Sequence, residues 1–140
     1  MDDDKRKEQG LQMRRTVLGE AHVARAQANT SEFNADFQDL ITRYAWGEIW
    51  TRPGLPRHTR SLLTIVMMVA TNREEELKLH LRAAANNGVT REEIKEALLQ
   101  TAIYCGVPAA NGAFRAAQEV FDAIDASHAG GTVPDAGQDA

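Results

Sequence analysis

The sequence predicts an all-α fold, a single-domain bundle of about six helices. Apolar residues recur every three or four positions through most of the chain, which is the period of an amphipathic helix. Residues suited to helix ends, such as Gly19, Gly88 and Pro108, separate these stretches. No stretch shows the alternation of a half-buried strand. With 140 residues, of which 43% are hydrophobic, the chain is long enough for one domain with a core.

The N-terminal third predicts three helices. The charged residues 1–9 are expected to fray, and a helix over 11–18 should end at Gly19 in a left-handed cap. A short helix over 20–28 should follow. A third helix is predicted in 30–46, because apolar residues have helical spacing there: Phe33, Phe37, Leu40, Ile41 and Tyr44.

Two glycines and two prolines interrupt the helical pattern in WGEIWTRPGLPRH, residues 46–58. The interruption predicts an ordered loop. Loops are usually polar, but this one contains Trp46, Ile49, Trp50 and Leu55, so it should pack against the rest of the protein.

The remaining helices follow from their apolar faces and end residues. Residues 59–70 are apolar nearly all round, which predicts a central buried helix. A helix over 76–88 should end at Gly88. TREE at 90–93 is a capping box that begins the next helix, which should bury Ile94, Ala97, Leu98 and Thr101. Pro108 should open the last helix, which carries Phe114, Ala117, Val120, Phe121 and Ile124.

These features predict one folded domain over residues 1–127 and a disordered tail over 128–140, which consists of small and polar residues.

The formal net charge is −4 and no basic block is present, so nucleic acid is not an expected partner. The longest uncharged run, residues 61–72, is too short to span a membrane, and the chain opens without an apolar signal. Cys105 is the sole cysteine. A cytoplasmic protein without membrane attachment is expected.

Glu76 and His80 are four residues apart on a predicted helix and should share a face, beside a stripe of Leu77, Leu81 and Ala84. Such a pair is often a helix-stabilising contact worth only about 0.2–0.5 kcal/mol. It can also place a proton donor at the edge of the core. The histidines and lone cysteine lack zinc-ligand spacing, so no metal is expected.

Other unusual residues have equally ordinary interpretations. Trp46 and Trp50 could be core residues, and the three arginines Arg52, Arg57 and Arg60 could face solvent. Tyr104 and Asn111 could satisfy backbone groups at a helix junction. His58, in a polar turn, is expected to be exposed, and Cys105 to be a small buried apolar residue.

Three irregular motifs occur in order: FQDLITRYAWGEIWTRPGLPRHTRSLLTI, EELKLHLRAAANNGVTREEIKE and YCGVPAANGAF, with VLGEAHVARA upstream. Over about residues 8–125 the chain resembles the 4-carboxymuconolactone decarboxylase family. Ala24 stands where relatives often have a polar residue, and Cys105 where alanine is common.

The resemblance implies an oligomeric helical enzyme, a trimer or hexamer, of the alkylhydroperoxidase D-like type. It would convert γ-carboxymuconolactone to β-ketoadipate enol-lactone and CO2, in protocatechuate catabolism by the β-ketoadipate pathway. Superfamily members with thiol peroxidase activity use a Cys-x-x-Cys pair before a helix histidine. If that histidine corresponds to His80, the cysteine positions are Arg73 and Glu76, so thiol chemistry is not expected.

The implied reaction assigns tasks to particular residues. The lactone enoate accepts the electrons released with CO2, so no cofactor is expected. Arg52 and Arg60 are candidates to hold the dicarboxylate lactone, because a guanidinium binds both carboxylate oxygens. His80 is expected to have a pKa near neutrality and to deliver the proton, with Glu76 fixing its tautomer.

Glu48 is an alternative proton donor or a residue that orients an arginine. Trp46 and Trp50 are expected to exclude water from the site, and Tyr104 and Asn111 are further substrate-binding candidates. Two alternatives remain open. One is a lactone isomerase or hydrolase on the same fold, and the other is a non-catalytic helical oligomer, in which these residues would scatter over the surface.

Overall fold

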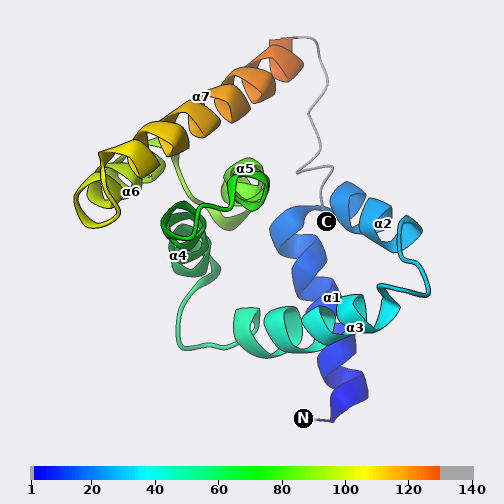
Figure 1. Cartoon of the computed structure of the whole chain (residues 1–140). Helices are drawn as coiled ribbons and strands as arrows, with labels where there is room; N and C mark the ends of the chain where they lie inside the picture. The colour runs from blue at the N-terminus through cyan, green and yellow to red at the C-terminus, as the bar shows by residue number, and fades with distance from the viewer. Residues whose placement is uncertain (1, 130–140) are drawn as a thin grey trace.

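The computed structural model describes residues 2–129. Within these residues all regular structure is helical, which confirms the predicted all-α class (Figure 1). Seven α-helices, one π-helix (η1) and one short 3-10 helix (η2) follow in the order α1 Asp3–Leu18, α2 Glu20–Ala28, α3 Ala35–Ile41, η1 Thr42–Trp50, α4 Arg57–Ala70, α5 Glu74–Ala83, η2 Ala84–Asn87, α6 Arg91–Tyr104 and α7 Val107–Ala129.

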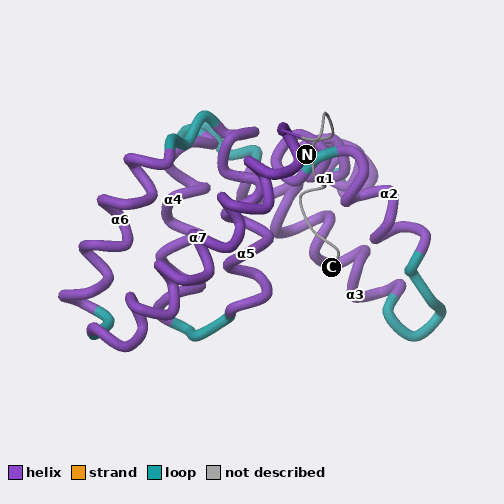
Figure 2. Tube along the Cα trace, turned by 90° about the horizontal axis from the view of Figure 1, so that it is seen from above, coloured by secondary structure: helices purple, strands orange, loops and turns teal. Residues whose placement is uncertain are grey.

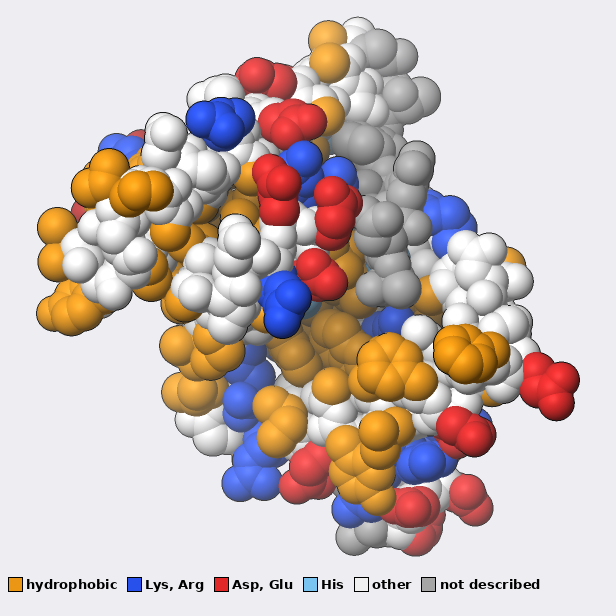
Figure 3. Space-filling view, viewed as in Figure 1, with side chains coloured by type: hydrophobic (Ala, Val, Ile, Leu, Met, Phe, Trp, Pro, Cys, Tyr) orange, Lys and Arg blue, Asp and Glu red, His pale blue; other side chains and the backbone are white. Residues whose placement is uncertain are grey.

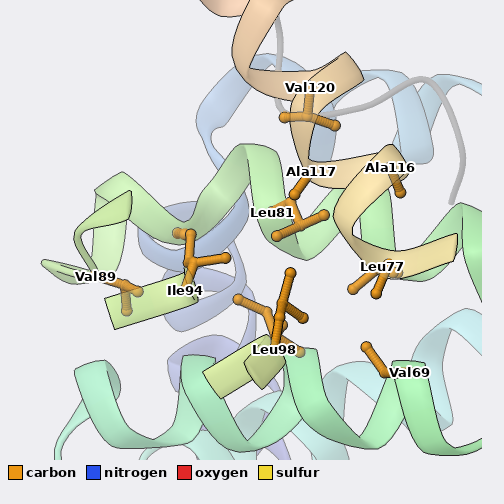
Figure 4. Packing of buried hydrophobic residues seen from close by; sticks show 12 residues of the cluster. Val69, Leu77, Leu81, Val89, Ile94, Leu98, Ala116, Ala117 and Val120 are labelled. Carbon is orange, nitrogen blue, oxygen red and sulfur yellow. The ribbon is translucent and has the colours of Figure 1, made fainter. Parts of the chain in front are cut away.

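The helices form two groups with α5 between them. Figures 1 and 2 place α1, α2 and α3 on one side of the molecule and α4, α6 and α7 on the other. Leu77 and Leu81 of α5 belong to the core of the second group, together with Ile65, Leu98 and Val120 (Figure 4). These side chains come from four helices, so this core joins α4, α5, α6 and α7.

The opposite side of α5 contacts the first group. Leu79 and Ala83 belong to a second core with Val17, Trp46 and Trp50, from α1 and η1. Alternate leucines of α5 therefore face two different cores. The helix predicted to be central was 59–70, but α5 holds this position.

The helix α4 is less buried than its composition suggested. Ser61, Ile65 and Val69 are buried, at positions i, i+4 and i+8 of one face. Leu63 and Met67, on another face, are 38% and 53% exposed. Apolar residues that are exposed in one chain can be buried when another molecule packs against them. A sequence pattern does not distinguish such residues from residues buried within the chain.

The predicted helix ends are largely confirmed. The η2 helix ends at Gly88 in the left-handed conformation, with a φ of 76°, whereas Gly19 ends α1 with a φ of 98° and a ψ of 149°, so the left-handed cap predicted there is wrong. A side chain with a Cβ rarely adopts such a φ, so glycine suits both positions. Thr90 and Glu93 form the expected capping box, and Pro108 lies in the first turn of α7.

The two ends of the described chain differ from the prediction. The residues expected to fray are helical from Asp3, because the side chain of Asp2 accepts a hydrogen bond from the backbone N–H of Lys5. At the other end, α7 continues through His128 and Ala129, which were assigned to the tail. Residues 130–140 of that tail lie outside the described residues.

The predicted loop 46–58 is wrong in its first part. The chain stays helical through Trp50 as the π-helix η1, and the irregular segment shrinks to residues 51–56. Hydroxyl groups support this helix at its two ends, where Thr42 Oγ1 donates to the carbonyl of Gln38 and Thr51 Oγ1 to that of Gly47. A π-helix has no simple sequence period, so glycines and prolines nearby suggested a loop instead.

Two glycines allow α1 and η1 to cross with their backbones in contact. A Cβ added at Gly10 would overlap the carbonyl oxygen of Thr42, and one added at Gly47 would overlap the carbonyl oxygen of Arg6. The crossing fixes η1 against α1 and so fixes the direction of its two tryptophans. None of the described helices is both long and apolar enough to cross a membrane.

Candidate active site

A stack of three rings lies between the two groups of helices. The ring centroids of Trp46 and Trp50 are 5.2 Å apart, and those of Trp50 and His80 are 6.4 Å apart with an angle of 9° between the planes. On the face shown in Figure 3, hydrophobic side chains are exposed between α5 and the α1–η1 pair. Trp46 and Trp50 are four residues apart on η1, so their indoles lie on one face of this helix and can be in contact.

The burial of His80 changes the chemistry expected of it. Burial, and to a smaller extent the nearby His22, lowers the pKa of His80 from 6.5 to about 4. His80 Nδ1 is buried and makes no hydrogen bond with the residues that the structure describes. The pKa near neutrality expected from the sequence is therefore wrong for the free protein, in which His80 is neutral at pH 7.

His22 was not among the predicted site residues. It lies on α2, is 1% exposed, and is close enough to His80 to affect its pKa. The segment VLGEAHVARA, which carries part of the family resemblance, was the available indication. The sharp turn at Gly19 brings His22 toward α5. No local sequence pattern predicts that these two helices approach each other.

The expected pairing of Glu76 with His80 does not occur. Glu76 is exposed in the first turn of α5, and within the described residues no hydrogen bond or ion pair joins it to His80. The imidazole stacks on Trp50 instead. The structure thus gives no basis for Glu76 fixing the tautomer of His80.

Glu48 and the two predicted arginines form a chain of contacts on the outer side of η1. Glu48 Oε1 accepts from Arg52 Nη1 at 3.3 Å, and Arg60 Nη2 donates to the carbonyl oxygen of Arg52 at 3.3 Å. Glu48 Oε2 lies 3.6 Å from Nε of Arg6. Glu48 therefore contacts two arginines and makes no contact with His80, and its role in the site stays a prediction.

A shallow, open cavity of about 500 Å³ adjoins the ring stack. Its wall includes Trp50 and Arg52, together with residues from the start of α4 and from η2: Arg57, His58 and Asn87. Trp50 therefore contributes both to the cavity and to the stack with His80. His58 was expected to be exposed, but it is half-buried and its Nε2 lies 2.6 Å from Oε2 of Glu93.

Two predicted substrate residues lie elsewhere. Tyr104, at the end of α6, is 82% exposed, and Asn111 is exposed in α7. Tyr104 and Cys105 line an apolar groove of about 640 Å³ between α4 and α6. Cys105 is exposed there, so the interpretation as a buried residue is wrong. Within this chain, neither Tyr104 nor Asn111 joins the residues around His80.

Metal ligands are not clustered in the described part of the chain. No group of three or more His, Cys, Asp or Glu side chains there is arranged to hold a metal ion. The groups that remain near the rings are imidazoles, indoles and guanidinium groups. Such groups bind anions, exclude water and move protons.

The chain is similar to known proteins over most of its length. Residues 35–119 match the model of the carboxymuconolactone decarboxylase family. A 4-carboxymuconolactone decarboxylase from Acinetobacter baylyi is 56% identical over 121 residues, which cover 86% of this chain and 90% of the relative. Nitrosuccinic acid decarboxylase npaB from Metarhizium robertsii is 44% identical over 119 residues, covering 84% of this chain and 83% of the relative. The protein belongs to the carboxymuconolactone decarboxylase family.

Proposed function

We propose that the protein is a cofactor-independent decarboxylase that converts γ-carboxymuconolactone to β-ketoadipate enol-lactone and CO2. The observation that carries the proposal is the position of Trp50, which stacks on His80 and also lines the cavity that contains Arg52. Trp50 therefore links the imidazole of His80, which can transfer a proton, with a cavity whose Arg52 can bind a carboxylate. The 56% identity to a 4-carboxymuconolactone decarboxylase supports the choice of substrate.

The reaction needs little from the protein besides charge and exclusion of water. The leaving carboxylate is on the carbon γ to the lactone carbonyl, and the electrons of the broken C–C bond move through the ring double bond to the carbonyl oxygen. One proton then bonds to the carbon α to the carbonyl. Because the lactone is the electron acceptor, no cofactor is required.

His80 is the proposed proton donor, and the substrate supplies the conditions for this role. In the free protein the imidazole is neutral, since burial disfavours its charged form. A substrate with two carboxylates brings negative charge close to the ring, which favours the imidazolium. His80 is therefore expected to take up a proton as the substrate binds and to transfer it to the dienolate.

The buried indoles are proposed to keep water from this step. Trp46 and Trp50 are 7% and 9% exposed. A dry site strengthens the contact between the imidazolium and the developing dienolate oxygen, and it disfavours a solvated leaving carboxylate. Arg52 and Arg60 are the proposed clamps for the substrate carboxylates.

The proposal includes a homo-oligomer, a trimer or hexamer, and a cytoplasmic location. The apolar groove between α4 and α6 supports association, because exposed Leu63 and Met67 line it and Ile103, beside it on α6, is 79% exposed. Tyr104 and Asn111, the further substrate-binding candidates, are proposed to reach a ring stack from a neighbouring subunit, since both lie away from His80 within one chain.

The experiment that tests the function is direct. Dialysed protein is mixed with γ-carboxymuconolactone, and CO2 and the enol-lactone are measured in the presence of a chelator. Release of both products at an undiminished rate supports the proposal, and a chelator-sensitive rate restored by metal would overturn its mechanism. Nitrosuccinate is assayed in parallel, since the Metarhizium relative is named as a decarboxylase of that dicarboxylate.

A further inference from the structure

The cavity beside Trp50 has a mixed wall, in which cationic and polar side chains alternate with apolar ones such as Met13 and Leu55. Arg52 comes from the segment after η1, Arg57 and His58 from the first turn of α4, and Asn87 from η2. Among the described residues that line it, none is Asp or Glu. A concave surface of this composition favours a small anion.

Arg57 is the one of these cations whose charge is not balanced by a nearby carboxylate. Arg52 contacts Glu48 at 3.3 Å, and His58 contacts Glu93 at 2.6 Å. Arg57 Nη2 instead donates to the carbonyl oxygen of Asn86 at 3.3 Å, and no described residue forms an ion pair with it. That bond orients a half-buried guanidinium without neutralising it, so its other N–H groups remain available to a ligand.

Two further groups at this position have unused hydrogen-bonding capacity. The first backbone N–H groups of α4, a helix of 14 residues, have no acceptor within the helix. Pro56 precedes the helix and provides no side-chain cap for them, so they can donate to a bound anion. Asn87 is 4% exposed, and its Oδ1 accepts no hydrogen bond from the described residues.

We propose that Arg57 is a specificity-determining residue that binds one carboxylate of the substrate in this cavity, so that the protein selects dicarboxylates over monocarboxylates. The inference rests on the proposed function, since it assigns one of the two substrate carboxylates to a place beside Trp50. Arg57 acts as a fork for this carboxylate, and the proton transfer occurs at His80, which stacks on the same Trp50.

The test uses two unreactive acids of equal length, so that it does not depend on turnover. Binding of adipate and of hexanoate is measured by calorimetry for the wild type, Arg57→Gln, Arg57→Lys and Arg115→Gln. Arg115 is an exposed arginine of α7, so its variant removes the same charge far from the cavity. Melting temperatures establish that each variant is folded, and competition by sulfate shows whether any small anion occupies the site equally well.

The wild type and Arg115→Gln should bind adipate at least about tenfold more tightly than hexanoate, and this preference should disappear in Arg57→Gln. Arg57→Lys, which keeps the charge but not the fork, should retain part of it. The inference is overturned if the wild type shows no preference, if Arg57→Gln keeps it, if Arg115→Gln loses it equally, or if sulfate competes as well as adipate. If adipate binding depends on Arg57 but the lactone releases no CO2, the site stands and the proposed reaction fails.

Discussion

His80 is placed where its charge depends on what lies beside it. A histidine in solvent would be partly protonated near pH 7, but this one is stacked on Trp50 and held neutral by burial and by the nearby His22. An anionic ligand reverses that balance. A single imidazole can thus remain uncharged in the empty site and become the acid when the substrate arrives.

Replacing His80 with Gln should lower kcat for γ-carboxymuconolactone at least about a hundredfold, because removing a general acid typically costs about 10² to 10⁴ in rate. Steady-state kinetics and the melting temperature are measured together, and the melting temperature at pH 7 should change little. In heavy water the wild type should place deuterium α to the lactone carbonyl. His128→Gln, at the exposed end of α7, serves as the control and should keep full activity. A near wild-type rate for His80→Gln would exclude His80 as the proton donor.

The lowered pKa of His80 also predicts how stability varies with pH. The unfolded chain binds a proton at this residue below about pH 6.5, whereas the folded protein does so only near pH 4, so acid favours unfolding between these values. The slope from this one group approaches about 1.4 kcal/mol per pH unit. Denaturant unfolding at pH 7 and pH 5 should show a smaller loss for His80→Gln than for the wild type. An equal loss in both proteins would mean that His80 titrates normally.

Single residues were predictable from sequence where their environment was local. The helix spacing correctly placed His80 at the edge of a core. It could not show that Leu79 and Ala83 face a second core, and this second core is what brings the tryptophans to the imidazole. Glu76 shares a helix with His80, but side-chain partners are chosen by tertiary packing as much as by spacing.

At the scale of helices, η1 is the element that most affects the site. It presents two indoles to α5 on one side and Glu48 to Arg52 on the other. Its helical form depends on close contact with α1 at Gly10 and Gly47, two residues separated by a helix, a turn and another helix. Local sequence suggested a loop because glycine and proline were judged without this contact.

Substitution of Gly47 by Ala should test the crossing. In an isolated helix alanine is the better residue by about 0.5–1 kcal/mol. Here its Cβ would overlap the backbone of Arg6, so we expect a loss of at least about 2 kcal/mol in the free energy of unfolding, as overpacking a dense contact does. Urea denaturation measures the change, and activity should fall as the tryptophans shift.

Gly112→Ala in α7 is the matched control, because a Cβ there would meet no atom within 4 Å. It should be neutral or stabilising by up to about 1 kcal/mol. If the two variants behave alike, the close approach of α1 and η1 is not a constraint on stability.

For the whole molecule, the exposed apolar surface between α4 and α6 has the strongest consequence. Figure 3 shows hydrophobic side chains at the corner between α6 and α7, where Ile103, Tyr104 and Val107 are 79%, 82% and 69% exposed. Such a surface is typical of one that another subunit covers. The sequence predicted a central buried helix here, and only the arrangement of the helices shows that one apolar face of α4 is exposed.

Met67→Glu should disrupt the proposed oligomer, because it places a charge in the groove where half of the Met67 side chain is exposed. Sedimentation at micromolar concentration should show a larger species for the wild type and the 15.4 kDa monomer for the variant. Ala123→Glu, on the exposed side of α7, adds the same charge elsewhere and should leave the oligomer intact. A wild type that sediments as a monomer would refute the proposed association.

The ring stack has an optical consequence. Trp46 and Trp50 are the two tryptophans of the chain, so its tryptophan fluorescence originates entirely beside His80. Two indoles with centroids 5.2 Å apart also couple their excited states, which should appear as paired bands in the circular dichroism of the aromatic transitions. A protonated imidazole quenches a neighbouring indole more strongly than a neutral one does. The emission of the unlabelled protein should therefore report the charge of His80 directly, in real time, as ligands enter and leave.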